Sequence, residues 1–210
     1  MNKHIAVFGS TGGTGKAVVE QALEKGYEVT ALVRTPSKLN IVHDHLYFVQ
    51  GNAMQYEDVQ AVVTEKDAVL CCLGTRAADK TMVRAMGTEN IVRVMEEENI
   101  RRLICQTSLG YGDSASAMPW YMTYIIIPYL LKNAFKDHAE QERIIEQSDL
   151  DWTIARPGSL TNGPKTENYR HGFPPATRTK LRISRADVAH FMLDQIESDG
   201  YLHQRVGLSY

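Results

Sequence analysis

The segment HIAVFGSTGGTG, residues 4–15, indicates more about the fold than any other stretch of this chain. A short apolar run at residues 5–8 leads directly into glycines at positions 9, 12 and 15, and residues 16–26 then carry apolar side chains at helical spacing. This pattern predicts a strand, a tight turn and a helix whose first N–H groups have no backbone partner. Because unpaired amides and the helix dipole both favour negative charge, we expect a phosphate at this helix N-terminus.

The three glycines have different expected roles in such a turn. Gly9 permits the turn itself, Gly12 leaves no Cβ where a pyrophosphate would approach, and Gly15 lets the helix pack closely on the strand. The spacing is G-x-x-G-x-x-G, and its place between strand and helix predicts nucleotide binding. A glycine-rich turn that binds nothing is the alternative. The predicted cofactor contacts in this turn are Gly9, Thr11, Gly12, Gly13, Thr14 and Gly15.

Strand-like and helix-like segments alternate along the rest of the chain, which predicts βαβ units and a parallel sheet. The further strands expected are residues 28–33, 46–49, 68–73, 103–106, 151–155 and 205–209. The further helices expected are residues 56–64, 81–99, 135–147 and 185–196, the last preceded by a capping box of Ser184 and Asp187. The predicted fold class is α/β, a Rossmann-like doubly wound parallel sheet.

The length of 210 residues, with 43% hydrophobic and 23% charged residues, fits one domain of this kind. We expect residues 1–210 to form that domain, with substrate-side loops at about 111–135 and 157–180. Residues 161–179 form the one long irregular stretch, which is more typical of a site loop or mobile segment than of an ordinary connection. A net charge of −2 gives no reason to expect a nucleic-acid partner.

The end of the second strand indicates which dinucleotide would bind. An NAD-selective site usually carries Asp or Glu there, to accept from the ribose hydroxyls. This chain instead reads LVRTPSK, with the cations Arg34 and Lys38 on either side of two hydroxyls. Such a set suits a dianionic 2′-phosphate, so NADP(H) is the predicted cofactor, and solvated basic side chains are the alternative. Asn52, after the third strand, is a candidate for pairing with the adenine edge.

The cysteines and the most apolar stretch indicate where in the cell the protein is expected. Cys71, Cys72 and Cys105 show neither metal-ligand spacing nor a disulfide framework, so we expect free buried thiols and no metal site. Residues 118–131 include two prolines and are shorter than the roughly 20 residues that a membrane span needs, so we expect no membrane partner. Residues 1–3 are too short for a signal peptide, which together with the thiols predicts a cytoplasmic protein.

The chain resembles the atypical short-chain dehydrogenase/reductases, specifically the small NAD(P)H-binding group that contains biliverdin-IXβ reductase/flavin reductase and the NmrA-like proteins. The similar segments are GSTGGTG (9–15), LVRTPSK (32–38), VLCCLGTR (69–76), GTENIV (87–92), LICQTSLGYG (103–112), DLDWTIARPGSLT (149–161) and ISRADVAHFML (183–193). The resemblance implies a Rossmann-like fold with the cofactor lying across the glycine turn, Arg34, residues 74–76 and Ser108. The expected contacts after the fourth, fifth and sixth strands are Gly74, Thr75, Arg76, Ser108 and Pro157.

The chain departs from these relatives in two places. The wider superfamily uses a Tyr-x-x-x-Lys pair as proton donor and cofactor anchor, whereas Tyr129 and Lys132 here are only three residues apart. Where biliverdin-IXβ reductase carries a histidine after the proline of the sixth strand, this chain has Gly158. The departures argue against Tyr/Lys chemistry and against activity on tetrapyrroles.

Four residues are candidates for a catalytic role. Ser108 is expected to donate a hydrogen bond to a substrate carbonyl, unless its hydroxyl only holds the strand end. His138, on a helix that the family places near the pocket, is a candidate acid, and a surface histidine is the alternative. Tyr111 and Tyr124 are further candidate proton donors. The aromatic residues of the 118–131 stretch either stack on a planar ring in the pocket or belong to the core or a homodimer surface; they are Trp120, Tyr121, Tyr124 and Tyr129.

Two classes of function are compatible with these features. The first is an NADPH-dependent oxidoreductase that transfers hydride to a small planar conjugated acceptor, such as a flavin or quinone; the cofactor then supplies the hydride and the protein supplies position and electrostatics. The second is a non-catalytic NADP-sensing regulator of the NmrA-like type. A sugar-nucleotide epimerase is less favoured, because the chain is too short for the usual substrate domain.

Overall fold

The computed structural model describes residues 3–76, 79–110, 112–117, 119–172 and 181–210. The strands of the main sheet are β1 (His4–Phe8), β2 (Glu28–Val33), β3 (Leu46–Gln50), β4 (Ala68–Cys71), β5 (Arg102–Gln106), β6 (Asp151–Pro157), β8 (Arg170–His171) and β10 (Gln204–Ser209). They lie in the order β3-β2-β1-β4-β5-β6-β10-β8 and are parallel except for β8, which pairs antiparallel with β10. A small second sheet pairs β7 (Ser159–Thr161) with β9 (Arg182–Ser184). The predicted Rossmann-like α/β fold is confirmed.

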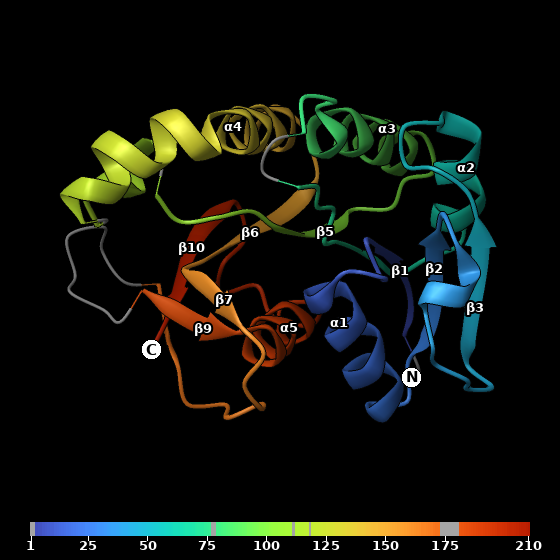
Figure 1. The fold of residues 1–210 in the computed structure, drawn as a ribbon. Helices are drawn as coiled ribbons and strands as arrows, with labels where there is room; N and C mark the ends of the chain where they lie inside the picture. The colour runs from blue at the N-terminus through green and yellow to red at the C-terminus, as the bar shows by residue number, and fades with distance from the viewer. Residues whose placement is uncertain (1–2, 77–78, 111, 118, 173–180) are drawn as a thin grey trace.

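Helices cover both faces of the main sheet (Figure 1). On one face lie α1 (Gly13–Glu24) and α5 (Arg185–Asp194), and on the other lie α2 (Tyr56–Val63), α3 (Val83–Glu97) and α4 (Lys132–Glu146). Two short 3-10 segments, η1 (Pro36–Lys38) and η2 (Gly112–Ala117), and the π-helix η3 (Met122–Leu131) complete the described elements.

The first strand shows how the sequence builds two hydrophobic layers. Successive side chains of a strand point to opposite faces, so a strand covered on both faces is apolar throughout. Ile5 and Val7 pack into the layer that contains α1 and α5, whereas Ala6 and Phe8 pack into the layer that contains α2, α3 and α4. All four side chains are fully buried. The glycine turn that follows is therefore anchored to both layers at once.

The strand order reverses at β1, which lies between β2 and β4. From β1 the chain proceeds to β2 and β3 on one side, and then returns to β4 on the other side. The loops that leave the carboxyl ends of β1, β2 and β4 thus converge at one edge of the sheet. An open parallel sheet binds its ligand at such a point.

Several predicted boundaries differ from the structure. Helix α1 begins at Gly13, three residues before the predicted start, because the Lys16 N–H already donates to the Gly12 carbonyl at 2.8 Å. Strand β4 ends at Cys71 rather than at residue 73, since the chain leaves the sheet there toward the loop at the carboxyl edge. Helix α4 begins at Lys132 rather than at 135, directly after η3. A substrate-side loop was predicted over about 111–135, whereas residues 122–131 of that range form the π-helix η3, which continues through Pro128 although proline offers no N–H.

The long stretch predicted as irregular contains short paired segments. Strands β7 and β8 overlap residues 161–179, and their partners β9 and β10 lie far along the chain. Strands of two or three residues have no recognisable period, so only the tertiary pairing defines them. Residues 173–180, which belong to the same predicted stretch, lie outside the described residues.

Truncation of the central core should destabilise the fold strongly. Leu70 on β4 is fully buried, so Leu70→Ala should lower the free energy of unfolding by about 2–5 kcal/mol through lost burial and a residual cavity. Chemical denaturation measures the change. Val42→Ala is the control, because Val42 is fully exposed and its truncation should change the free energy by less than about 0.5 kcal/mol. Equal effects of the two substitutions would contradict the assignment of the core.

Candidate functional site

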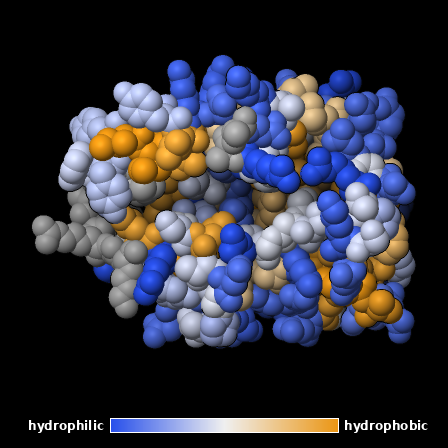
Figure 2. All heavy atoms as spheres, in the orientation of Figure 1, coloured by the Kyte–Doolittle hydropathy of each residue, from blue (hydrophilic) through white to orange (hydrophobic). Residues whose placement is uncertain are grey.

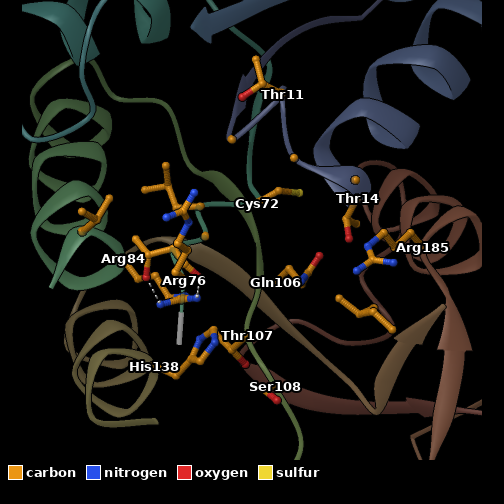
Figure 3. Close-up of a pocket in the computed structure, with 18 of the residues that line it drawn as sticks. Thr11, Thr14, Cys72, Arg76, Arg84, Gln106, Thr107, Ser108, His138 and Arg185 are labelled. Carbon is orange, nitrogen blue, oxygen red and sulfur yellow. Dashed lines mark hydrogen bonds between the residues drawn. The ribbon is translucent and has the colours of Figure 1, made fainter. Parts of the chain in front are cut away.

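A cavity of about 820 Å³ opens at the carboxyl edge of the sheet, where the strand order reverses. Figure 3 shows Thr14 and Arg185 on one wall, with Arg76 and Arg84 opposite and Ser108 and His138 between the two walls. The volume is within the range of small-molecule and cofactor sites. The residues that line it include Gly9, Thr11, Gly12, Gly13, Thr14, Arg34, Lys38, Asn52, Gly74, Thr75, Arg76, Arg84, Gln106, Ser108, Leu131, Phe135, His138, Pro157, Gly158, Leu160 and Arg185.

The glycine turn is built so closely that side chains are excluded from it. Gly9 has a φ of +76°, and a Cβ there would lie 2.2 Å from the Cys72 carbonyl oxygen. A Cβ on Gly15 would lie 2.2 Å from the carbonyl oxygen of Gly9 itself. The Gly12 N–H donates to that same carbonyl at 2.9 Å, which closes the turn. The roles predicted for Gly9 and Gly15 therefore have a direct steric basis.

The N-terminus of α1 opens into the cavity, between Gly12, Gly13 and Thr14. Within the described residues, no side chain caps this end and no acidic residue lies in its first turn. The first amides of a helix have no intrahelical partner, and they carry the positive end of the dipole. The donor chemistry and the absence of side-chain atoms at the glycines both fit the pyrophosphate of a dinucleotide.

The two cations predicted to select a 2′-phosphate lie on the cavity wall. Arg34 follows directly after β2, and Lys38 ends the short turn η1, in which the Lys38 N–H donates to the Thr35 carbonyl at 3.1 Å. This turn brings Lys38 back toward Arg34, and both side chains are exposed to solvent. Among the described residues, neither forms an ion pair with a carboxylate, so both charges are available to a ligand.

Asn52 lines the cavity, although its side chain already has a local role. Its Oδ1 accepts from the Met54 N–H at 3.2 Å, and its own backbone N–H donates to Asp58 Oδ2 at 2.8 Å. These bonds fix the loop after β3 in one conformation. Pairing of the Asn52 amide with the adenine edge stays a prediction.

A buried ion pair supports the loop after β4. Arg84 and Asp137 are 7% and 3% exposed, and Arg84 Nη1 donates to Asp137 Oδ2 at 3.1 Å. The same Nη1 donates to Thr75 Oγ1 at 2.9 Å, so the pair holds the loop of Gly74, Thr75 and Arg76 in place. Removal of one member would leave a buried charge without compensation, which usually costs several kcal/mol.

Asp137 also caps a helix that is distant in the sequence. Its carboxylate accepts from the Arg84 N–H at 3.2 Å and from the Ala85 N–H at 2.9 Å, the first amides of α3. The residue before this helix, Met82, has a φ of +53° and provides no side-chain cap. A carboxylate at a helix N-terminus is stabilised by the amides and the dipole. Helix α4 thus fixes the start of α3, and with it the loop that lines the cavity.

A second buried ion pair lies beneath the loop after β5. Arg156 donates from Nε to Glu142 Oε1 at 2.9 Å, and its Nη2 donates to the other oxygen of the same carboxylate. Thr107 Oγ1 donates to Glu142 Oε1 at 2.6 Å. A bidentate pair of this kind has a defined geometry, so it positions the backbone of residues 107–108.

Ser108 lies at the cavity with its hydroxyl turned toward the backbone. The hydroxyl donates to the Leu109 carbonyl at 3.0 Å, and the side chain is half-buried. Pro157, at the end of β6, lines the cavity beside it. The structure therefore shows the backbone-holding alternative for the Ser108 hydroxyl in the absence of a substrate, and hydrogen bonding to a substrate stays a prediction.

His138 lines the cavity but differs from the expected proton donor. It is 8% exposed, and burial, followed by the positive charge of Arg84, lowers its pKa to about 3. Gln141 uses its amide nitrogen on Thr88 Oγ1, so its carbonyl oxygen faces His138 Nδ1 at 3.3 Å. An imidazole with this pKa is neutral at physiological pH. His138 can therefore form hydrogen bonds in the cavity, but it carries no spare proton as an acid there.

Of the two tyrosines predicted as further donors, the structure describes only Tyr124 and does not bring it to the site. Tyr124 is 71% exposed on η3 and does not belong to the cavity lining, and Tyr111 lies outside the described residues. Trp120, Tyr121 and Tyr129 are also exposed, and Figure 2 shows an apolar patch over this helix. Of the two predicted uses of these aromatic residues, the geometry favours a surface over a pocket wall. The apolar lining includes Leu131, Phe135 and Leu160 instead.

Comparison with known proteins identifies the family. Residues 9–199 match the model of a family described as NAD(P)H-binding. The chain belongs to this NAD(P)H-binding family. The match extends over most of the chain and agrees with the resemblance to the atypical short-chain dehydrogenase/reductases. Family membership agrees with dinucleotide binding at the glycine turn, and the contacts of its individual residues stay predictions.

The proteins similar to this NAD(P)H-binding protein include an uncharacterized relative and solved structures of reductases. The uncharacterized chloroplastic protein At2g34460 of Arabidopsis thaliana is 31% identical over 180 residues, which cover 79% of this chain and 62% of that protein. A short-chain dehydrogenase/reductase of Veillonella parvula in complex with NADP has a TM-score of 0.81 at 18% identity, over 100% of this chain and 95% of the other. ChuY, an anaerobillin reductase from Escherichia coli O157:H7, has a TM-score of 0.80 at 22% identity, over 98% and 96%. The chain thus spans about three-fifths of the plant relative, and the structural neighbours establish the fold.

Sequence reasoning missed four residues that this family member places at or behind the cavity: Arg84, Gln106, Asp137 and Arg185. Gln106 ends β5, and Arg185 begins α5. Arg84 and Asp137 are 53 positions apart, so no local pattern connects them. The burial that distinguishes Arg84 and Asp137 from surface residues is visible only in the structure. Among the described residues, no helix combines the length and the apolar character that a membrane crossing requires.

The lowered pKa of His138 predicts a stability loss on acidification. The unfolded imidazole takes up a proton near pH 6.5, whereas the folded one does so only near pH 3, so stability should decline as the pH falls from about 6.5. His138→Gln should reduce this decline. Urea denaturation from pH 4 to pH 8 measures the slope, and NMR titration of the imidazole measures the pKa directly. A His138 ring that titrates near pH 6.5 in the folded protein would contradict the assignment.

Proposed function

We propose that this protein is an NADPH-dependent reductase of a small planar conjugated acceptor, such as a flavin or a quinone. The observation that supports this proposal best is one continuous cavity that joins a dinucleotide turn, a cationic loop and an apolar region. Membership of the NAD(P)H-binding family is consistent with an oxidoreductase. Bound NADPH supplies the hydride in such enzymes, whereas the protein supplies position, exclusion of water and electrostatics.

The choice of NADP(H) over NAD(H) is supported by the charges on the wall. Arg34 and Lys38 line the cavity and would hold the 2′-phosphate, and in the described chain neither forms an ion pair with a carboxylate. Arginine can hydrogen-bond a phosphate in a planar, bidentate manner, and lysine adds a point charge. The structural neighbour from Veillonella parvula was obtained with NADP, which agrees with this choice.

The apolar side of the cavity supports a planar acceptor. Leu131, Phe135 and Leu160 line the cavity together with the loop of Ser108. An apolar wall with few polar groups suits a flat conjugated ring, which gains from burial and needs only one or two hydrogen bonds for orientation. Ser108 is the group on this wall that we expect to bind an acceptor carbonyl, after its hydroxyl leaves the Leu109 carbonyl.

Position 158 supports an acceptor other than the one bound by biliverdin-IXβ reductase. A Cβ on Gly158 would lie 2.5 Å from the Leu181 carbonyl oxygen and 3.1 Å from the Arg182 nitrogen. A histidine therefore cannot occupy this position unless strand β9 moves. The acceptor site of this protein consequently lacks the side chain that its relative carries there.

The remaining partners and the location are inferred from the surface and the thiols. Cys71, Cys72 and Cys105 are free and buried, which supports the expectation of a reducing cytoplasmic compartment. The exposed aromatic residues of η3 offer a surface on which a homodimer would form. A small-molecule acceptor is the partner that the cavity itself supports.

The cofactor preference can be tested by calorimetry. NADPH should bind at least about tenfold more tightly than NADH, since each charge-assisted hydrogen bond to the 2′-phosphate contributes roughly 1.5–3 kcal/mol. Arg34→Ala should remove most of this preference while leaving NADH affinity unchanged. Lys3→Ala, which removes a cation remote from the cavity lining, is the control for net charge. Equal affinities for the two cofactors in the natural sequence would refute the preference.

The acceptor can be tested by steady-state oxidation of NADPH with a panel of flavins and quinones. We expect measurable turnover with at least one of them, and Ser108→Ala should lower kcat by about 100-fold or less, as for a single positioned hydrogen-bonding group. Ser148→Ala is the matched control, because its hydroxyl binds the Ile145 carbonyl at the end of α4. Tight NADPH binding without turnover on the whole panel would reject the reductase and favour an NADP-sensing regulator.

A further inference from the structure

Arg185 lies directly against the glycine turn, although 172 positions of sequence separate it from Gly13. A Cβ on Gly13 would lie 2.5 Å from Arg185 Cδ and 2.7 Å from its Nε. The side chain therefore passes over the start of α1 where only a glycine leaves room for it. Figure 3 shows Arg185 beside Thr14, with its guanidinium directed into the cavity.

Arg185 differs from the two buried arginines near this cavity, Arg84 and Arg156, in having no carboxylate partner among the described residues. Arg84 and Arg156 are each paired with a buried carboxylate, from Asp137 and Glu142 respectively. Arg185 is half-buried, and its Nη1 donates at 2.6 Å to the amide oxygen of Asn162. In the described part of the chain, no carboxylate lies within ion-pair distance of it. A guanidinium held by a neutral amide at the wall of a site keeps its full charge for an anion.

Hydrogen bonds of Asp187 connect the segment that carries Asn162 to the helix that carries Arg185. Asp187, in the first turn of α5, accepts from the Thr166 N–H at 2.7 Å and from the Glu167 N–H at 2.9 Å. It also accepts from the Tyr210 hydroxyl at 2.7 Å. Burial alone would raise the pKa of Asp187, but these hydrogen bonds outweigh it and lower the pKa below its ordinary value. The ionised carboxylate thus ties the segment after Asn162 to the helix that carries Arg185.

We propose that Arg185 is a cofactor-binding residue that closes over the pyrophosphate of the dinucleotide, opposite the amides of the α1 N-terminus. The proposal rests on the dinucleotide binding proposed above, but not on any particular acceptor. The turn provides N–H donors from one side, and Arg185 provides a planar cation from the side of α5. Helix α1, which follows β1, and helix α5, which follows β9, thereby hold the same pyrophosphate.

The position of Arg185 separates its role from that of Arg34. Every nicotinamide dinucleotide carries the pyrophosphate, whereas only NADP(H) carries the 2′-phosphate. Loss of Arg185 should therefore weaken all dinucleotides by a similar factor and leave the NADP/NAD ratio unchanged. Loss of Arg34 should change that ratio. The two cations can thus be told apart by the choice of ligand alone.

The first experiment measures dissociation constants by calorimetry for NADP⁺, NAD⁺ and ADP-ribose, which keeps the pyrophosphate but lacks the nicotinamide. Arg185→Ala should weaken all three by about 10-fold to 100-fold, as expected for the loss of charge-assisted hydrogen bonds. Arg185→Lys should retain part of the affinity as a point charge. The matched control is Arg182→Ala, an exposed arginine on the neighbouring strand β9 that does not line the cavity, which should leave the three constants unchanged.

The second experiment tests the contact with Gly13 by a double-mutant cycle. Gly13→Ala should retain the fold, since alanine has a higher helix propensity than glycine, but its methyl group should displace Arg185 and weaken ADP-ribose. In the Arg185→Ala background the same change should have little further effect, so the two substitutions should be strongly non-additive. Thermal denaturation of each variant verifies that it is folded.

Three results would overturn the proposal. One is an Arg185→Ala protein that binds ADP-ribose normally; an increased KM for the acceptor in that variant would place the arginine at the acceptor instead. Another is a reduced affinity for NADP⁺ with no change for NAD⁺. The third is full additivity in the cycle with Gly13→Ala. A protein that binds all three nucleotides as expected but reduces no acceptor would refute the proposed reductase and leave the Arg185 proposal supported.

Discussion

The candidate site depends on one close contact between the backbones of three segments, where no side chain fits between them. The end of β4, the turn after β1 and the first turn of α1 approach so closely that a methyl group on Gly9 or Gly15 would overlap a carbonyl oxygen. This contact fixes the N-terminus of α1 relative to the two central strands. In the proposed complex the amides at that terminus would hold the phosphates, so this contact would set the position of the cofactor as a whole.

Helix α4 has a comparable organising role on the opposite side of the cavity. It carries two buried carboxylates, Asp137 and Glu142, each of which binds an arginine from another element. Through Arg84 it holds the loop after β4, and through Thr107 it holds the loop after β5. Buried pairs of this kind contribute less to net stability than to a defined arrangement, because desolvation offsets much of their attraction. Here they fix the positions of the two cavity loops relative to each other.

The features that sequence could predict are those whose cause is local. The strand and glycine turn, the helical periods and the cationic loop at Arg34 each depend on residues within a few positions of one another.

The predicted capping box of Ser184 and Asp187 forms only in part. Ser184 does accept from the Asp187 N–H at 2.9 Å, as predicted, but the Asp187 carboxylate does not return the bond. The Tyr210 hydroxyl accepts the Ser184 N–H instead, and Asp187 binds Thr166 and Tyr210. The contacts of Asp137 with Arg84 and of Arg185 with Gly13 likewise cross more than 50 positions, and they arise only from the tertiary fold.

The glycine at position 158 limits how this cavity can diversify. The backbone of β9 fills the space in which a side chain would lie, so most single substitutions there must displace a strand of the second sheet. Strand β9 leads directly into α5, so any such displacement would also move Arg185, the residue that we propose to bind the cofactor. A change of the proposed acceptor site is therefore more accessible at other lining positions, such as Ser159 and Leu160. Position 158 can therefore vary only in concert with the second sheet, which couples the side-chain choice at this one position to the path of a whole strand.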